Sequence, residues 1–182
     1  MINFKANLIH NTTIQKRGLN NRYDNYSVSF VELNPNNFQD VVCINKANAT
    51  WKDSDTYADD IAYKLNSLFQ GSKNEDSTRF FAIAKQNARF HELDYSDVLG
   101  LAEIAKERDG AGIIRLFQVR PDTMRGVENR EYKKVGLTLL DNLLKVMKEK
   151  TIYVDATDAG ASLYAKKGFK IHDSFGRMIL KR

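Results

Sequence analysis

Residues 152–170 of the chain read IYVDATDAGASLYAKKGFK. The β-branched and aromatic residues at the start of this stretch predict a strand over residues 151–154. Asp158 is the predicted N-cap of a short helix that carries Tyr164, and Gly168 is expected to end that helix. Residues 169–171 then predict another short strand. The stretch therefore reads as strand, helix, strand.

The preceding third of the chain predicts a longer helix that follows several strands. One apolar face defines the helix and is formed by Val135, Leu139, Leu140, Leu143, Val146 and Met147. Three strand-like runs come before it, at Arg79–Lys85, Val98–Lys106 and Ala111–Val119. Asp109-Gly110 lies between the last two runs and is typical of a hairpin turn. Met178–Leu180 predicts a final strand near the C-terminus.

The first 71 residues predict one strand and two helices. The strand covers residues 28–33, and Asn36 or Asn37 is expected to cap a helix over residues 38–45. Asp53 or Ser54 is expected to cap the second helix, which ends at Gly71 and has an apolar face of Tyr57, Ile61, Leu65, Leu68 and Phe69. Residues 1–23 either add a strand or hairpin or are partly mobile. The whole order predicts the α/β (α+β) class, in one domain with a sheet that has helices on both faces.

Composition narrows the class of protein. The chain has 182 residues, a single cysteine (Cys43) and a formal net charge of +5. It has no apolar run of about 18 residues and no secretory signal, so we expect a cytoplasmic protein without a membrane span. Residues 111–182 carry 15 basic and 8 acidic side chains. That basic third would suit an anionic cofactor, nucleic acid or an acidic partner, although lysines that only solvate helix faces are the ordinary explanation.

Two segments resemble the GNAT superfamily of N-acetyltransferases. Residues 162–170, with Tyr-x-Lys-x-Gly-Phe behind a strand, are similar to the end of that family's domain. Residues 129–140, NREYKKVGLTLL, resemble its acyl-CoA loop, Arg/Gln-x-x-Gly-x-Gly/Ala, and the helix that follows. Glu131 stands where the family has Arg or Gln, and Lys134 where it has the first Gly, while Gly136 remains. The segment from Arg120 to Glu131 is also longer than the family's usual link.

The resemblance runs from about Val28 to Arg182 and implies a fold and a boundary. It implies a single-domain GNAT-like fold with a mixed, mostly antiparallel central sheet and helices on both faces. Residues 28–182 would form the acyltransferase domain, and residues 1–27 an N-terminal extension or extra strands.

The resemblance also implies a set of site residues for acetyl-CoA as acyl donor. Residues along one strand would contact the pantetheine arm, namely Phe117, Gln118 and Val119. Residues at the loop and helix start would bind the pyrophosphate, namely Arg130, Lys133, Lys134, Val135, Gly136 and Leu137. Tyr164 matches the family's general acid; without this context it would be an ordinary core aromatic beside Leu163.

The general base is not marked by any motif. Glu103 is a candidate because it lies on a predicted strand, although an acid there is ordinarily solvent-facing. His91 and His172 are further candidates, since histidine titrates near neutral pH. His10, His91 and His172 lack metal-ligand spacing, so we expect no metal. Cys43 falls in the first predicted helix and is expected to be a small core residue rather than a nucleophile.

Two classes of function fit these residues. The first is an acyl-CoA-dependent N-acetyltransferase that acts by direct attack of a primary amine carried by a small molecule, a protein or an aminoacyl-tRNA. The second is a catalytically degenerate GNAT-fold protein that binds protein or nucleic acid, which the substitutions at Glu131 and Lys134 would favour. A weaker alternative is a regulatory partner that docks through the long segment 120–131. A monomer and a homodimer are both compatible with the sequence.

Overall fold

The computed structural model describes residues 6–51, 58–74, 77–85 and 93–182. Its strands form a 9-stranded sheet in the order β6-β1-β2-β3-β4-β5-β7-β9-β8. The strands are β1 (Asn7–Arg17), β2 (Tyr23–Leu33), β3 (Arg79–Lys85), β4 (Val98–Lys106), β5 (Gly112–Val119), β6 (Tyr132–Lys133), β7 (Thr151–Asp155), β8 (Lys170–Ile171) and β9 (Arg177–Lys181). The helices are α1 (Phe38–Thr50), α2 (Ala58–Phe69), α3 (Val135–Val146) and α4 (Asp158–Ala165), with 3-10 turns at Tyr95–Asp97 and Pro121–Thr123.

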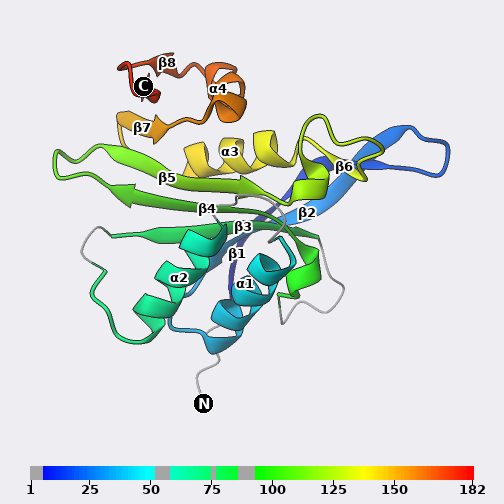
Figure 1. The fold of residues 1–182 in the computed structure, drawn as a ribbon, viewed down its shortest axis with the longest axis horizontal. Helices are drawn as coiled ribbons and strands as arrows, with labels where there is room; N and C mark the ends of the chain where they lie inside the picture. The colour runs from blue at the N-terminus through cyan, green and yellow to red at the C-terminus, as the bar shows by residue number, and fades with distance from the viewer. Residues whose placement is uncertain (1–5, 52–57, 75–76, 86–92) are drawn as a thin grey trace.

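Helices cover the sheet on both faces, and each face has its own hydrophobic cluster (Figure 1). The α1 and α2 side is filled around Ile44 and Leu65, which are fully buried. The opposite side is filled around Leu139 of α3, and Tyr164 of α4 belongs to the same cluster. Burial on two faces explains why β3 reads as the nearly uninterrupted apolar run RFFAIAK: Phe80 packs toward α1 and α2, and Phe81 toward α3.

The predicted class of fold is confirmed: neighbouring strands pair antiparallel except β5 and β7, which are parallel. The parallel pair matters because β5 and β7 separate beyond it. The parallel pairing covers only three residue pairs and ends at Ile114 opposite Val154, yet β5 continues to Val119. In the β4–β5 ladder the register shifts between Glu103 and Ile104, so that Arg115 and Leu116 occupy the space of one residue. A bulge of this kind bends a strand, and β5 here leaves the edge of β7.

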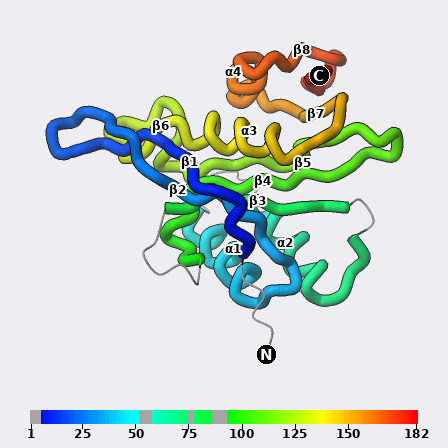
Figure 2. The backbone as a smooth tube through the Cα atoms, turned by 180° about the vertical axis from the view of Figure 1, so that it is seen from behind, coloured from blue at the N-terminus to red at the C-terminus, as the bar shows by residue number. Residues whose placement is uncertain are grey.

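An antiparallel hairpin of β1 and β2 lies at the other end of the sheet (Figure 2). Its turn contains Asn21 at φ 62°, a left-handed conformation that asparagine tolerates. The two-residue strand β6 pairs with β1 at Gln15 and Lys16. Residues 7–17 thus add a strand to the same sheet, and the predicted boundary before Val28 falls inside β2.

The local expectations differ from the structure in a few places. The N-cap of α4 is Thr157 and not Asp158: the Thr157 side chain accepts the Gly160 N–H at 3.2 Å, and Asp158 lies in the first turn, where its charge suits the helix dipole. The short strand β6 is not predicted from sequence. The predicted caps Asp53 and Ser54, with Tyr57, lie outside the described residues. None of the helices in the described part of the chain has the length and hydropathy that a bilayer-spanning helix needs.

Candidate functional site

A cavity of about 530 Å³ lies where β5 and β7 separate. Its walls are the outer half of β5, the segment after β5, the start of α3, the end of β7 and α4. Because β7 ends at Asp155, the edge of β5 beyond Ile114 has no strand beside it on this side. A strand edge of this kind offers backbone N–H and C=O groups to an extended ligand.

The start of α3 forms one end of the cavity. Lys134 is its N-cap and has a left-handed backbone, φ 65° and ψ 10°, which is uncommon for a residue other than Gly, Asn or Asp. Its side chain makes no capping hydrogen bond, and the first intrahelical bond runs from the Thr138 N–H to the Lys134 carbonyl at 2.9 Å. The N–H groups of the first turn are therefore available to an anion, and the helix dipole adds partial positive charge there.

Gly136 lies in this first turn and keeps the cavity open. A Cβ added to Gly136 would lie 3.5 Å from Val119 Cγ1, 3.6 Å from Leu163 Cδ2 and 3.7 Å from Phe117 Cε1. Those three side chains belong to the cavity walls. The position therefore tolerates a methyl group, whereas a large side chain would have to occupy the cavity itself.

Positive charge dominates the lining. Five cationic side chains contribute to it, from Arg115, Arg125, Arg130, Lys134 and Lys166. Among the described residues, Asp155 is the carboxylate that lines the same space, and its Oδ1 accepts a hydrogen bond from Arg177 Nε at 2.9 Å. Since that carboxylate is already neutralised from outside the cavity, the site favours an anionic ligand.

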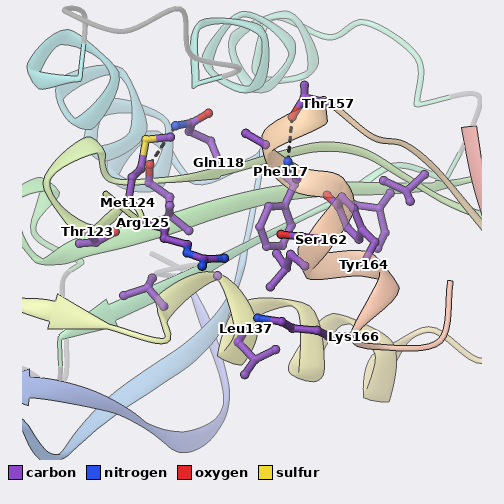
Figure 3. A pocket seen from close by; sticks show the side chains of 18 of the residues that line it. Phe117, Gln118, Thr123, Met124, Arg125, Leu137, Thr157, Ser162, Tyr164 and Lys166 are labelled. Atoms are coloured by element: carbon purple, nitrogen blue, oxygen red, sulfur yellow. Dashed lines mark hydrogen bonds between the residues drawn. The ribbon is translucent and has the colours of Figure 1, made fainter. Parts of the chain in front are cut away.

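Tyr164 forms part of the opposite wall, on α4 (Figure 3). Its ring packs edge-on against Phe117, with 5.9 Å between centroids, and against Phe169 at 5.6 Å. A Cβ on Gly160 would come within 3.3 Å of Tyr164 Cε2, so the glycine makes room for the ring. The residue is 4% exposed, and it lines the cavity.

The structure brings most of the sequence-predicted residues together around this cavity. They are Phe117, Gln118, Val119, Arg130, Lys134, Val135, Gly136, Leu137 and Tyr164. Lys133 is not among the lining residues, because it belongs to β6 and its Nζ lies 3.6 Å from the centroid of the Tyr23 ring. A lysine engaged in a cation–π contact there points away from the start of α3.

Glu103 also lies outside the cavity lining. The expectation of a solvent-facing acid is wrong, because Glu103 is 1% exposed beneath α2. Its Oε1 accepts a hydrogen bond from Lys64 Nζ at 2.6 Å, while Oε2 has no hydrogen-bond partner in the described part of the chain. The ion pair accounts for the burial of this charge, and its role as a base stays a prediction.

Several lining residues have no motif to mark them. The segment after β5 contributes Thr123, Met124 and Arg125, and α4 contributes Ser162 and Lys166. The one available signal for the first group is the unusual length of the link from Arg120 to Glu131. For the second group, the signal is the position of Ser162 and Lys166 either side of Tyr164 on one short helix.

The remaining candidate groups lie elsewhere. His172 is exposed and its ring lies 5.5 Å from Tyr153, whereas His91 lies outside the described residues. Cys43 is buried in α1, and burial raises the pKa of its thiol to about 12, which leaves it protonated at neutral pH. In the described ranges, no group of three or more His, Cys, Asp or Glu side chains is arranged to hold a metal ion.

Comparison with solved structures identifies the architecture. No family model and no curated protein matches the sequence. An acetyltransferase of the GNAT family from Desulfovibrio desulfuricans superimposes with a TM-score of 0.58 at 13% identity, over 85% of this chain and 98% of the other. The chain has the GNAT fold.

Other solved proteins share the GNAT fold with similar coverage. The N-acetyltransferase PseH of Campylobacter jejuni gives a TM-score of 0.51 at 17% identity, over 85% of this chain and 98% of its own. The NatC complex bound to Gag peptide and CoA gives 0.53 at 14% identity, over 85% and 98%. The GNAT fold predicted from residues 129–140 and 162–170 is thereby confirmed, and both segments lie at the cavity.

Replacing Lys134 by glycine should separate backbone strain from charge. A left-handed backbone costs a non-glycine residue roughly 1–2 kcal/mol, so Lys134→Gly should raise the free energy of unfolding by about 1 kcal/mol after the entropy of glycine is included. The same change removes one cavity cation and should weaken binding of CoA several-fold. Chemical denaturation and isothermal titration measure the two effects.

Asn129→Gly is the matched control, because Asn129 also has a positive φ of 54° but asparagine tolerates it. It should lower rather than raise stability, because it also removes the hydrogen bond from Arg17 Nη1 to Asn129 Oδ1 at 3.0 Å, and it should leave CoA binding unaltered, since Asn129 does not line the cavity. A Lys134→Gly variant that is less stable than the native chain would contradict the strain argument.

Proposed function

We propose that the protein is an acyl-CoA-dependent N-acetyltransferase that transfers an acetyl group to a primary amine by direct attack. The observation that supports this most is the cavity between the separated ends of β5 and β7, which faces the uncapped start of α3 and is lined by five cations. The pantetheine arm of acyl-CoA is extended and mostly apolar, which matches the open edge of β5. The phosphates of acyl-CoA match the cationic start of α3. The single buried thiol of Cys43 is consistent with a cytoplasmic location.

The residues present fit acetyl-CoA in two regions. Along β5, the open strand edge beside Phe117 and Val119 would hold the pantetheine arm by backbone hydrogen bonds. At α3, the first-turn N–H groups of Val135, Gly136 and Leu137 would hold the pyrophosphate, with Lys134 adding a charge where the family has glycine. Bound there, acetyl-CoA would supply an activated thioester.

Acetyl transfer requires the protein to stabilise the sulfur that leaves the thioester. As the amine nitrogen bonds to the carbonyl carbon, the carbon–sulfur bond breaks and the sulfur leaves with the electron pair. We assign to the Tyr164 hydroxyl the donation of a proton to that sulfur. Full proton transfer from a phenol (ordinary pKa near 10) to a thiolate (conjugate acid pKa near 8.5) is uphill by about 2 kcal/mol. The hydroxyl therefore acts by a hydrogen bond that stabilises the negative charge developing on sulfur, and the proton follows as the carbon–sulfur bond breaks. The buried ring, held between Phe117 and Phe169, keeps that hydroxyl oriented.

The proton lost by the attacking amine needs a separate acceptor. Glu103 is one of the candidate bases, and its Oε2 has no hydrogen-bond partner among the described residues. Its contact with Lys64 and its place beneath α2, outside the cavity lining, support a role in the ion pair instead. We therefore route no step through Glu103: the proton lost by the amine nitrogen passes to solvent water in the cavity, and the phenolate of Tyr164 regains a proton from the same solvent, so that no net proton is lost.

The alternative of a degenerate binding protein rests on Lys134 and Glu131. Loss of the cofactor site would be expected to leave that space filled by side chains, whereas the cavity is present and keeps Gly136 at its end. Among the structural neighbours, NatC is bound to a peptide and AtaT to acetyl-methionyl-tRNAfMet. We propose an acceptor amine carried by either kind of molecule or by a small one.

Ligand-dependent stabilisation tests the proposal directly. A ligand at 100 times its Kd stabilises the folded state by about 2.7 kcal/mol, which for a chain of this size raises Tm by roughly 5–10 °C. We expect that rise with acetyl-CoA, and little change with a short acetyl thioester that has no phosphates. No shift with millimolar acetyl-CoA would contradict the proposed function. Salt-sensitive binding to RNA or DNA in its place would support the degenerate binding protein.

A further inference from the structure

The cavity carries more cationic side chains than a pyrophosphate at α3 requires. Arg130 Nη1 donates to the Met124 carbonyl at 3.3 Å, and Lys134 stands at the helix start itself. Two further cations, Arg125 and Lys166, line the same space, and no described residue forms a hydrogen bond or ion pair with either side chain. Both residues are exposed, so water solvates them in the free protein, but cations that line one space repel one another and a further negative charge in the ligand would relieve that repulsion.

These two cations come from different walls. Arg125 lies in the segment that follows β5, and Lys166 is the residue that ends α4. In the view of Figure 3, both side chains reach toward the first turn of α3, Arg125 from the side of Met124 and Lys166 from the end of α4. A ligand bound at that turn would therefore have a charge on each side of it.

The segment that carries Arg125 is anchored rather than loose. Thr123 is buried, and its hydroxyl donates to the Arg120 carbonyl at 2.7 Å. Arg120 in turn forms two hydrogen bonds with the Asp122 carboxylate, at 2.7 and 2.8 Å, and its N–H donates to the Leu99 carbonyl. The Arg130 contact with Met124 closes the segment from its other end. The long link thus holds Arg125 at the cavity.

We propose that Arg125 and Lys166 bind the 3′-phosphate of CoA and make the protein select CoA over 3′-dephospho-CoA. The inference rests on the proposed function, because it assumes that acyl-CoA occupies this cavity. A phosphate monoester carries roughly 1.5–2 negative charges at neutral pH and three acceptor oxygens, which suits a guanidinium and an ammonium together. The first-turn N–H groups of α3 and Lys134 remain for the pyrophosphate.

A cycle of two ligands and two proteins tests this assignment by isothermal titration. The native chain should bind CoA at least about tenfold more tightly than 3′-dephospho-CoA, the effect of losing charge-assisted hydrogen bonds. The double variant Arg125→Gln with Lys166→Gln should bind CoA more weakly by a similar factor, and its affinity for 3′-dephospho-CoA should be nearly unchanged. Arg108→Gln with Lys148→Gln is the matched control, because it removes the same two charges at exposed positions outside the cavity lining.

The outcomes separate this inference from the proposed function. Equal affinity of the native chain for the two ligands overturns it and leaves acyl-CoA binding intact. The inference is also overturned if the double variant loses affinity for CoA and for 3′-dephospho-CoA by the same factor, because the two cations then bind the pyrophosphate that both ligands share. Absence of binding by either ligand to the native chain overturns the proposed function and the inference with it. Circular dichroism of each variant confirms that the fold is retained.

Discussion

Gly136→Trp is expected to abolish binding of acetyl-CoA while the fold remains intact. The Cβ of any side chain at this position would enter between Val119, Leu163 and Phe117, and the indole beyond it would fill the space between β5 and α4. The backbone of Gly136 is ordinary helix and not left-handed, so the substitution adds no conformational strain. Isothermal titration should show a Kd weakened by about 100-fold or more, equivalent to at least roughly 2.7 kcal/mol.

Gly136→Ala is the control that separates bulk from loss of the glycine. The added methyl group would meet its neighbours at 3.5–3.7 Å, which is ordinary van der Waals contact, and alanine favours the helix over glycine. This variant should therefore fold at least as well as the native chain and keep most of its affinity. If the tryptophan variant folds and still binds acetyl-CoA with native affinity, the assignment of the cavity is refuted.

Local sequence patterns were sufficient for the main body of the fold. Phe80 and Phe81 on opposite faces of β3 show why that strand reads as an apolar run, and the spacing of Leu139 and Leu143 marks the buried face of α3. Such positions are predictable because strand and helix periodicity alone decide which side chains face the core. The resemblance at residues 162–170 then supplied the topology that periodicity does not contain.

The features that escaped prediction depend on contacts distant in sequence. The two-residue strand β6 exists because Tyr132 and Lys133 pair with β1, more than a hundred residues earlier. The side chain of Lys133 accordingly lies over the Tyr23 ring, although its position in the sequence matches the acyl-CoA loop. Glu103 is buried because Lys64 of α2 reaches it, a pairing that neither strand nor helix pattern reveals. Long-range pairing of this kind overrides local preference.

The basic last third of the chain supplies the positive charge of the cavity. All five cations of the cavity lie in residues 111–182, the third in which basic residues most exceed acidic ones. Other basic residues of that third are engaged elsewhere, as Arg177 is with Asp155. Five of the fifteen basic side chains in that third therefore share one concave surface.

The second large effect is expected at Tyr164, where removal of a single oxygen should slow turnover without weakening binding. In Tyr164→Phe the ring keeps its contacts with Phe117 and Phe169, so the cavity wall and the affinity for acetyl-CoA should change by less than about twofold. General acid catalysis typically contributes 10²–10⁴-fold, and kcat should fall by about 100-fold or more.

Steady-state kinetics and titration of the same preparation distinguish this role from a structural one. Loss of a proton donor lowers kcat and leaves Tm and the affinity for acetyl-CoA unchanged, whereas loss of packing would lower Tm and affinity together. Tyr153→Phe is the matched control: Tyr153 lies on β7 outside the cavity lining, against Arg177 and His172, and its hydroxyl should be dispensable for turnover. Turnover of Tyr164→Phe at the native rate would remove Tyr164 from the mechanism. The proton that the departing sulfur needs would then have to come from another donor at the same wall, with Ser162 the neighbouring hydroxyl there.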